Sequence, residues 1–409
     1  MPPPMHLPPA EQHRLTLGYM RLTDSAPLIV ARERGLFDDY GLDVTLQREV
    51  SWANLRDRLV AGSLDAGQLL APLSFATGLG AGGLRANLIT GLSLGLNGNA
   101  ITLSNSLWDR LSLLMPEEGE APDPVAIAST LAEGIRHGRV RDTVTLATVH
   151  AFSMHSFLLR LWLKAGGLDP DHDVRLIVLP PEQMCDSLAR GVIDGFCVGE
   201  PWSTVAVEQG IGSVAASGYQ IWNNAPEKVL GVTSRWHQQH PGAHLRLRLA
   251  IMEACRLLDE PRHRESAAAL LSKQQFLDLP EKVLLPSLTG NYRFHKHSTA
   301  VYVPSFHVFW RWQACFPWRS HADWMTCQCS ALYGKATDDE QRLALVQQCY
   351  RPDLYREAAR VLGIATPVKD SKPENCHYEE WLLPNGITLG PDLMLSGAES
   401  TIAVQTPWT

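Results

Sequence analysis

The sequence predicts an α/β protein made of two similar lobes with a ligand-binding cleft between them. Residues 57–67, running on to Pro72, share a template with residues 186–196, running on to Pro201. The Asp, Leu, Gly, Asp and Pro positions of the two copies are identical without a gap. Strands alternate with helices around each copy, and 409 residues exceed the size of one ordinary hydrophobic core.

Each copy of the template describes the end of a helix followed by a short strand. Gly62 and Gly191 stand where a helix commonly ends with a residue in the left-handed conformation. Asp65 and Asp194 then open the strand, and the Pro at the end of each copy suits the first turn of the next helix. A repeated unit of this kind predicts two facing lobes, and a cleft between lobes is a common place for a ligand.

The first lobe begins with alternating strands and helices. Asp24 and Ser25 are candidate N-cap residues of its first helix, and Ser51 is the candidate for its second. Apolar residues at every second position predict the strands. In chain order the expected elements are strand 15–19, helix 27–34, strand 42–46, helix 51–60 and strand 88–96.

An acidic, Pro-rich stretch at residues 116–124 predicts the crossing from the first lobe to the second. The later elements expected are strands 143–147, 174–179 and 228–232 and helices 153–162, 245–258, 266–272, 338–348 and 351–362. This order predicts a disordered Pro-rich N-terminus at 1–14, a first lobe at 15–118 with 240–365, a second lobe at 119–239 and a C-terminal arm at 366–409.

Composition limits the partners and the compartment. A net charge of −7, from 36 Lys and Arg against 43 Asp and Glu, argues against direct nucleic-acid binding. No apolar run reaches the ~18 residues of a membrane span, so no membrane contact is expected. The first ten residues lack a basic start and an apolar stretch, which predicts a cytoplasmic protein with its eight cysteines reduced. The cysteine and histidine spacing matches no zinc site, so neither a metal nor another cofactor is expected.

Side chains that donate hydrogen bonds gather where predicted strands end and helices begin. These candidates for anion binding are Trp52, Asn97-Gly98-Asn99, His155 and Lys228, with Gln68 as a weaker one. Indole N–H, amide, imidazole and ammonium groups can all point a donor at an anion. Each also has an ordinary interpretation: a packed Trp, a turn, a structural His and a solvated Lys. No nucleophile elbow, phosphate-binding loop or dinucleotide fingerprint is present, so no catalytic residue is assigned and no enzyme activity is expected.

Seven motifs together resemble one family. They are LGYMRLTDSAPL (17–28), GLFDDYGL (35–42), LNGNAITLS (96–104), LKAGGLDP (163–170), FCVGEPW (196–202), PEKVLGV (226–232) and FPWRSHADW (316–324). The chain resembles the nitrate- and bicarbonate-binding solute-binding proteins of ABC transporters. The resemblance implies a type 2 periplasmic-binding-protein fold, in which two α/β lobes are joined by crossovers around a ligand cleft. Members with a secretion signal or lipid anchor deliver their anion to a membrane permease.

The N-terminus departs from those members, so the chain is most similar to cytoplasmic nitrate/nitrite sensors of the NasS type. There the implied partner is a NasT-like ANTAR antiterminator, an RNA-binding protein that the sensor releases when the anion binds. The resemblance places anion-binding roles on Trp52, His155 and Lys228, and on Asn99 in place of the family's Gln. Bicarbonate-binding relatives carry an acidic residue at the position of Lys228. A pocket of donors alone suits nitrate or nitrite, which present only acceptors.

Three functions remain open at this point. The first is the cytoplasmic sensor, and the second is a transport component whose start codon hides a signal. The third is an enzyme related to pyrimidine-precursor synthases, which would need a reactive His and a Cys cluster that the sequence does not show. The protonation state of His155 is also open. If the imidazolium binds the anion, affinity falls as pH rises through about 6.5.

Overall fold

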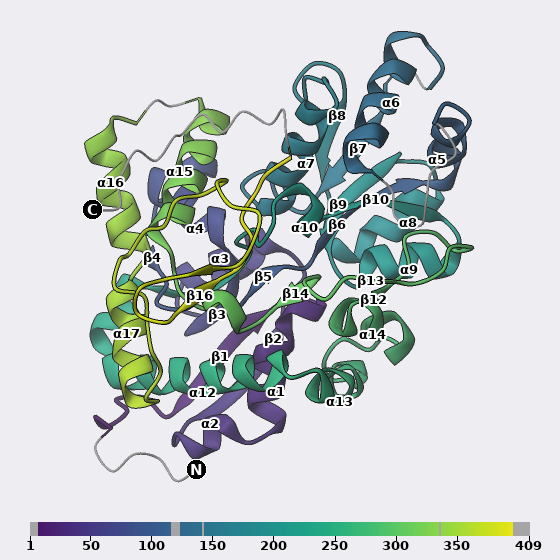
Figure 1. The fold of residues 1–409 in the computed structure, drawn as a ribbon. Helices are drawn as coiled ribbons and strands as arrows, with labels where there is room; N and C mark the ends of the chain where they lie inside the picture. The colour runs from purple at the N-terminus through teal and green to yellow at the C-terminus, as the bar shows by residue number, and fades with distance from the viewer. Residues whose placement is uncertain (1–6, 116–122, 141–142, 335–336, 396–409) are drawn as a thin grey trace.

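The computed structural model describes residues 7–115, 123–140, 143–334 and 337–395. It contains two α/β lobes, each built around a five-stranded sheet (Figure 1). The first sheet has the strand order β2-β1-β3-β11-β4. Its strands are β1 (Arg14–Tyr19), β2 (Asp43–Arg48), β3 (Ala66–Leu70), β4 (Leu88–Ile89) and β11 (Lys228–Thr233). The second sheet has the order β10-β6-β9-β7-β8 and consists of β6 (Asn99–Ser104), β7 (Thr145–Thr148), β8 (Arg175–Val178), β9 (Gly195–Gly199) and β10 (Gly212–Ser217).

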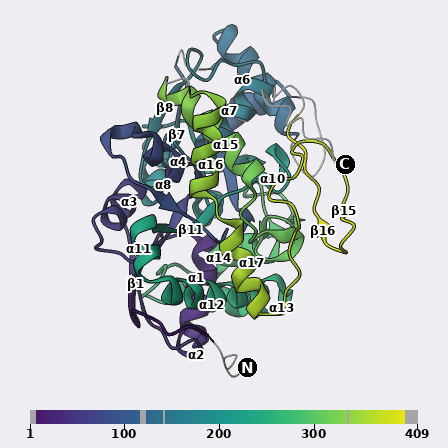
Figure 2. The ribbon, with the colours of Figure 1, turned by 90° about the vertical axis from the view of Figure 1, so that its left-hand side faces the viewer.

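Helices cover both sheets, and the predicted two-lobed α/β fold is confirmed. In the first half they are α1 (Ala26–Glu33), α2 (Leu36–Asp39), α3 (Trp52–Val60), α4 (Ala71–Leu79), α5 (Asn105–Ser112), α6 (Pro124–Arg136), α7 (Met154–Ala165), α8 (Met184–Ala189), α9 (Trp202–Gln209) and α10 (Gly218–Ile221). The later helices are α11 (Ser234–Gln239), α12 (Pro241–Asp259), α13 (Pro261–Ser272), α14 (Glu281–Thr289), α15 (Arg319–Tyr333), α16 (Asp339–Cys349) and α17 (Pro352–Val361). Figure 2 shows α15, α16 and α17 along one side of the molecule. Within the described ranges, no helix combines the length and the apolar character needed to cross a bilayer.

Short 3₁₀ helices and two-residue strands complete the fold. The 3₁₀ helices are η1 (Thr23–Ser25), η2 (Ala81–Gly83), η3 (Pro181–Gln183) and η4 (Arg311–Gln313). The short strands are β5 (Leu96–Asn97), β12 (Asn291–Tyr292), β13 (Val301–Tyr302), β14 (His307–Val308), β15 (Trp381–Leu382) and β16 (Thr388–Leu389). The single strand expected at 88–96 is therefore divided into β4 and β5.

The repeated template has the same role in both lobes. Gly62 and Gly191 follow α3 and α8 with φ of 77° and 67°, as the sequence predicts. Asp65 Oδ2 accepts a hydrogen bond from the N–H of Thr16 on β1 (2.7 Å), and Asp194 Oδ2 accepts one from the N–H of Thr145 on β7 (2.9 Å). In each lobe this carboxylate ties the strand that it opens to the neighbouring parallel strand.

The chain changes lobes earlier than the sequence predicts. β5 pairs with β14, whereas β6, which follows after Gly98, pairs inside the second sheet with β9 and β10. β11 belongs to the first sheet, although it lies inside the predicted second lobe at 119–239. The crossovers thus lie near residue 98 and between β10 and β11. Most of the predicted crossing, residues 116–122, lies outside the described residues.

Two other boundaries also differ from the prediction. Residues 291–306, assigned to the first lobe, pack on the second, where Phe294 O accepts a hydrogen bond from the N–H of Val214 on β10 (2.7 Å). Residues 7–13, part of the terminus predicted as disordered, lie along α12. There the Glu11 carboxylate accepts hydrogen bonds from the N–H groups of Gly242 (3.0 Å) and Ala243 (3.1 Å). Free N–H groups in the first turn of a helix attract a carboxylate, and a composition rich in Pro does not reveal this contact.

The C-terminal arm, described to residue 395, crosses the face of the molecule between the lobes (Figure 1). It contacts the crossover between β10 and β11, where Trp222 Nε1 donates to Asp392 Oδ1 (2.7 Å). Asp392 also accepts from Lys372 Nζ (2.5 Å). Asp370 of the arm pairs with Arg319 on α15 (2.7 Å) and Arg356 on α17 (2.6 Å), so the arm connects the return crossover with the later helices.

Candidate functional site

Four of the predicted site residues meet between the lobes. Trp52 begins α3 and Lys228 begins β11, both in the first lobe, whereas Asn99 begins β6 and His155 lies in the first turn of α7, both in the second. All four side chains are at most 1% exposed. Each therefore stands at a strand or helix end that faces the other lobe.

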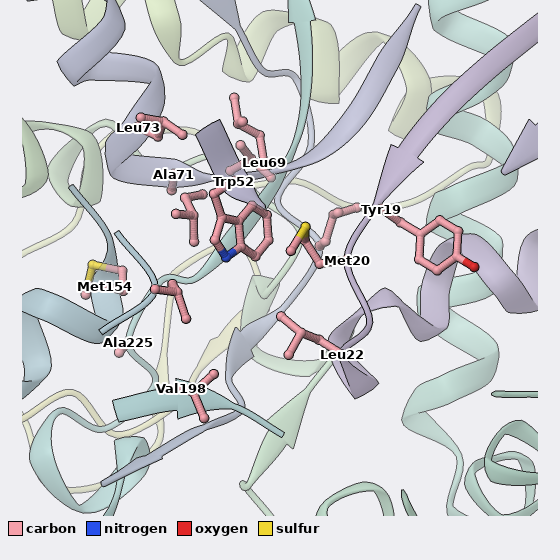
Figure 3. Close-up of a cluster of buried hydrophobic side chains, with 14 of the residues drawn as sticks. Tyr19, Met20, Leu22, Trp52, Leu69, Ala71, Leu73, Met154, Val198 and Ala225 are labelled. Atoms are coloured by element: carbon pink, nitrogen blue, oxygen red, sulfur yellow. The ribbon is translucent and has the colours of Figure 1, made fainter. Parts of the chain in front are cut away.

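Several atoms of this cluster have no hydrogen-bond partner among the described residues. They are the indole Nε1 of Trp52, both ring nitrogens of His155 and Oδ1 of Asn99. In Figure 3 the Trp52 ring lies among Met20 and Leu69 of the first lobe, with its nitrogen directed toward the side where Val198 and Ala225 lie. Buried polar groups without partners cost about 1–3 kcal/mol each, so a group of them that faces one place indicates a ligand site.

Lys228 is the charged centre of the site. Its Nζ lies 2.8 Å from Asp24 Oδ2, 2.5 Å from Glu227 Oε1 and 5.3 Å from the centroid of the Trp52 ring. Burial favours the neutral amine, but the two carboxylates outweigh burial and raise the pKa of Lys228. The side chain is therefore an ammonium at neutral pH.

The two carboxylates were missed in the sequence. Asp24 is one of the two predicted N-cap residues of the first helix, yet the N-cap of α1 is Ser25, without a side-chain cap hydrogen bond. Instead, Asp24 Oδ1 accepts from Gln68 Nε2 (2.6 Å), and Oδ2 pairs with Lys228. An N-cap pattern in the sequence cannot reveal these two contacts, because Gln68 lies on β3 and Lys228 on β11. The only sequence signal for the second carboxylate is that Glu227 precedes Lys228.

Glu227 makes the site different from the pocket of donors that was expected. Its Oε2 accepts from Asn99 Nδ2, and its Oε1 lies 3.8 Å from His155 Nε2, too far for a hydrogen bond. Burial raises the pKa of the Glu227 carboxyl above its ordinary value, and the charge of Lys228 offsets this only in part. The prediction that the pocket presents only donors is therefore corrected: a buried acid stands beside the ammonium.

His155 is a neutral imidazole in this environment. Burial, and next the charge of Lys228, hold its pKa well below the ordinary value of 6.5. A neutral ring carries one N–H and can donate one hydrogen bond to a ligand. Without an anion, this environment therefore disfavours the imidazolium form of His155.

The other predicted site residues hold the site in place. Gln68 Oε1 accepts from the N–H of Met20 (3.1 Å), and its Nε2 donates to Asp24 Oδ1 (2.6 Å). The amide thus holds the end of β1 and the Asp24 carboxylate in place. Asn97 Nδ2 donates to Ser305 O (2.8 Å), and its Oδ1 accepts from the N–H of Ala225 (3.0 Å). Gly98 has φ of 92°, and a Cβ there would lie 2.3 Å from the His307 ring. The sequence places these residues near the site, but its pattern does not distinguish a residue that contacts the ligand from one that supports the site.

Arg21 connects the lobes beside this cluster. Its guanidinium is fixed on the first lobe by the carbonyls of Leu277 and Asp278, the latter at 2.7 Å. From there Nη1 donates to Glu182 Oε2 on η3 of the second lobe (2.9 Å), and the group lies over the Trp202 ring (5.7 Å). Because the guanidinium is held on the first lobe, its contact with the second lobe stabilises the arrangement in which the lobes enclose Lys228.

Comparison with known proteins agrees with the fold. Residues 8–272 match the model of the NMT1-like family. The chain is 37% identical over 359 residues to the nitrate import ATP-binding protein NrtC of Synechocystis, covering 86% of this chain and 51% of that protein. The chain thus spans about half the length of the first curated relatives that it matches.

The nitrate/nitrite binding protein NrtA of Synechocystis is 31% identical over 384 residues, which cover 92% of this chain and 82% of that protein. The crystal structure of the periplasmic nitrate-binding protein NrtA superposes with a TM-score of 0.81 at 30% identity, covering 94% of this chain and 97% of that one. The names of the NrtA proteins describe binding, not catalysis. Bicarbonate proteins match as well, among them the bicarbonate transport ATP-binding protein CmpC of Synechocystis at 37% identity over 86% of this chain and 51% of that protein. The chain therefore belongs to the NMT1-like family, and its relatives include nitrate- and bicarbonate-binding proteins.

Proposed function

We propose that this protein binds nitrate or nitrite in the buried cluster between its lobes. The observation that carries the proposal is the meeting of three buried donors: Lys228 Nζ lies 5.3 Å from the centre of the Trp52 ring and 2.5 Å from Glu227 Oε1, which is 3.8 Å from His155 Nε2. Nitrate presents only acceptor oxygens, and nitrite presents acceptor oxygens and a nitrogen lone pair. Both anions therefore match N–H donors. The Lys228 ammonium can also donate a charge-assisted hydrogen bond to the anion.

Replacing Trp52 with phenylalanine tests the direct contact. The ring face under Lys228 remains, while the indole N–H is lost. A hydrogen bond to a charged group contributes about 1.5–3 kcal/mol, so nitrate affinity should fall about tenfold to hundredfold in calorimetric titration. Trp162→Phe is the matched control, since that buried indole donates to Pro124 O in the second lobe. If Trp52→Phe and Trp162→Phe bind nitrate equally, the indole does not contact the anion.

Arg21→Gln is expected to speed the release of the anion without touching it. Loss of the contact with Glu182 and Trp202 makes opening of the lobes easier, so the dissociation rate should rise about threefold to tenfold. Stopped-flow displacement of nitrate measures this rate. Arg160→Gln removes an ion pair with Asp171 inside the second lobe and should leave the rate unchanged. Equal rates for both variants would show that Arg21 does not hold the lobes together.

For the cellular role, the names of the relatives favour a substrate-binding component of an ABC importer for nitrate or nitrite. In that role the partners are the membrane permease and its ATP-binding subunit. Closing of the lobes on the anion would create the surface that the transporter distinguishes, because a ligand shifts a conformational equilibrium only by binding one state better.

A second role is favoured by the cysteines. All eight are free thiols, and Cys376 is exposed, which suits a reducing compartment. In this role the protein is a cytoplasmic nitrate/nitrite sensor that sequesters a NasT-like ANTAR antiterminator and releases it on anion binding. Size-exclusion chromatography with such a protein separates the two roles. A complex that forms without nitrate and dissociates with it supports the sensor, whereas no complex in either condition leaves transport as the role.

A further inference from the structure

The charges around Lys228 do not balance once an anion arrives. The cluster holds two buried carboxylates, Asp24 and Glu227, against one ammonium, while His155 is neutral. With both acids ionised its net charge is −1 before any ligand is present. A monovalent anion would bring this to −2 in a site whose side chains are nearly inaccessible to water, which is costly in a low dielectric.

The groups that face Glu227 come from every element packed around it. Lys228 on β11 and Asp24 on η1 are charged, whereas His155 on α7 and Asn99 on β6 are neutral. The Cys197 thiol on β9 and the Tyr350 hydroxyl lie within range of its charge, and burial raises the pKa of both, so they remain neutral. Among these groups, the described residues offer no second cation to balance the anion.

We propose that Glu227 is a proton-binding residue of the anion site, and that the protein takes up one proton from solvent with each nitrate or nitrite ion it binds. This inference rests on the proposed function and adds a second ligand, the proton, to the same site.

The contacts of Glu227 explain why the proton would go there. Without the anion, its carboxylate is stabilised by Lys228 Nζ at 2.5 Å and by the Asn99 amide. An anion that accepts hydrogen bonds from Lys228 and Asn99 competes for both donors and adds a negative charge nearby. The Glu227 carboxylate then gains a proton from water, and its new O–H can donate to the anion. The cluster keeps a net charge of −1, and Glu227 changes from an acceptor into a donor.

Asp24 is less suited to this role. Its Oδ1 accepts a hydrogen bond from Gln68 Nε2 on β3 (2.6 Å). An anion beside Trp52 would not compete for this donor, so the Asp24 carboxylate keeps one of its hydrogen bonds. His155 is the real competitor, because an anion in contact with its ring would favour the imidazolium. Substitutions at the two positions separate these possibilities.

The test is calorimetric titration with sodium nitrate in HEPES and in Tris at matched pH and ionic strength. The difference in observed enthalpy between buffers gives the number of protons taken up. The wild-type protein should take up about one proton per anion. Because linkage is reciprocal, its nitrate affinity should then fall about tenfold for each unit by which pH rises between the ligand-free and the ligand-bound pKa of Glu227. Glu227→Gln should bind nitrate with no proton uptake and an affinity independent of pH from 6 to 9.

Glu208→Gln, which removes an exposed partner of Arg293, is the matched control and should keep the uptake. Wild-type binding without proton uptake overturns the proposal, and so does uptake that persists in Glu227→Gln and is lost in His155→Gln. Absence of nitrate binding to the wild-type protein is a different result, because it rejects the proposed function itself. Circular dichroism of each variant confirms that it is folded before titration.

Discussion

Lys228→Met is expected both to destabilise the protein and to remove anion binding. Two carboxylates, on Asp24 and Glu227, lose the ammonium that lies 2.8 and 2.5 Å away. Breaking a buried ion pair by removing one partner costs about 3–5 kcal/mol, because the remaining charge is left uncompensated. Nitrate affinity should fall at least about tenfold, since a charged hydrogen bond is lost and the acids repel the anion.

Urea unfolding measures the stability and calorimetry the binding. Lys164→Met, at an exposed position on α7, is the control and should change neither. Adding Glu227→Gln to Lys228→Met should recover part of the lost stability, because one of the two orphaned charges is then removed. An unfolding free energy unchanged in Lys228→Met would mean that the three groups do not form the buried ion cluster.

Gly98→Ala is expected to cause the second large loss of stability. This residue lies at the crossover between the lobes. The residue has φ of 92°, and an added Cβ would meet the His307 ring at 2.3 Å. The ring cannot move away freely, because His307 is buried, stacks on Phe309 and hydrogen-bonds Thr23 Oγ1 (3.0 Å). A strained backbone together with overpacking should lower the unfolding free energy by about 2–4 kcal/mol.

Gly62→Ala separates strain from overpacking. Gly62 also has positive φ, 77°, but nothing lies within 4 Å of its Cβ position. That variant should lose only about 1 kcal/mol, the cost of the left-handed conformation for a residue with a side chain. Equal losses at the two glycines in thermal or urea unfolding would show that the His307 contact adds nothing.

The sequence predicted the fold well because the fold depends on local and repeated patterns. Gly62 and Gly191 end helices, and Asp65 and Asp194 repeat one hydrogen bond in both lobes. The lobe boundaries were harder. β6 and β11 are ordinary strands in sequence, and only their pairing with distant partners shows that each belongs to the other lobe.

The site was predicted in part for the same reason. Trp52 and His155 begin helices and Lys228 begins a strand, positions that a pattern of elements reveals. Asp24 and Glu227 were missed because their contacts join elements that are distant in the sequence: Asp24 on η1 pairs with Lys228 on β11, and Glu227 accepts from Asn99 on β6. The consequence is physical: the charge of the site, and hence its response to pH, follows from residues that the sequence did not single out.

The most direct test of the account is calorimetric titration of the purified wild-type protein with nitrate, nitrite, bicarbonate and chloride at matched ionic strength. We expect saturable one-to-one binding of nitrate or nitrite, with bicarbonate and chloride giving no heat of binding. Silence with both nitrogen oxyanions, or a preference for bicarbonate, would contradict the assignment of Trp52, His155 and Lys228 to a nitrate or nitrite site.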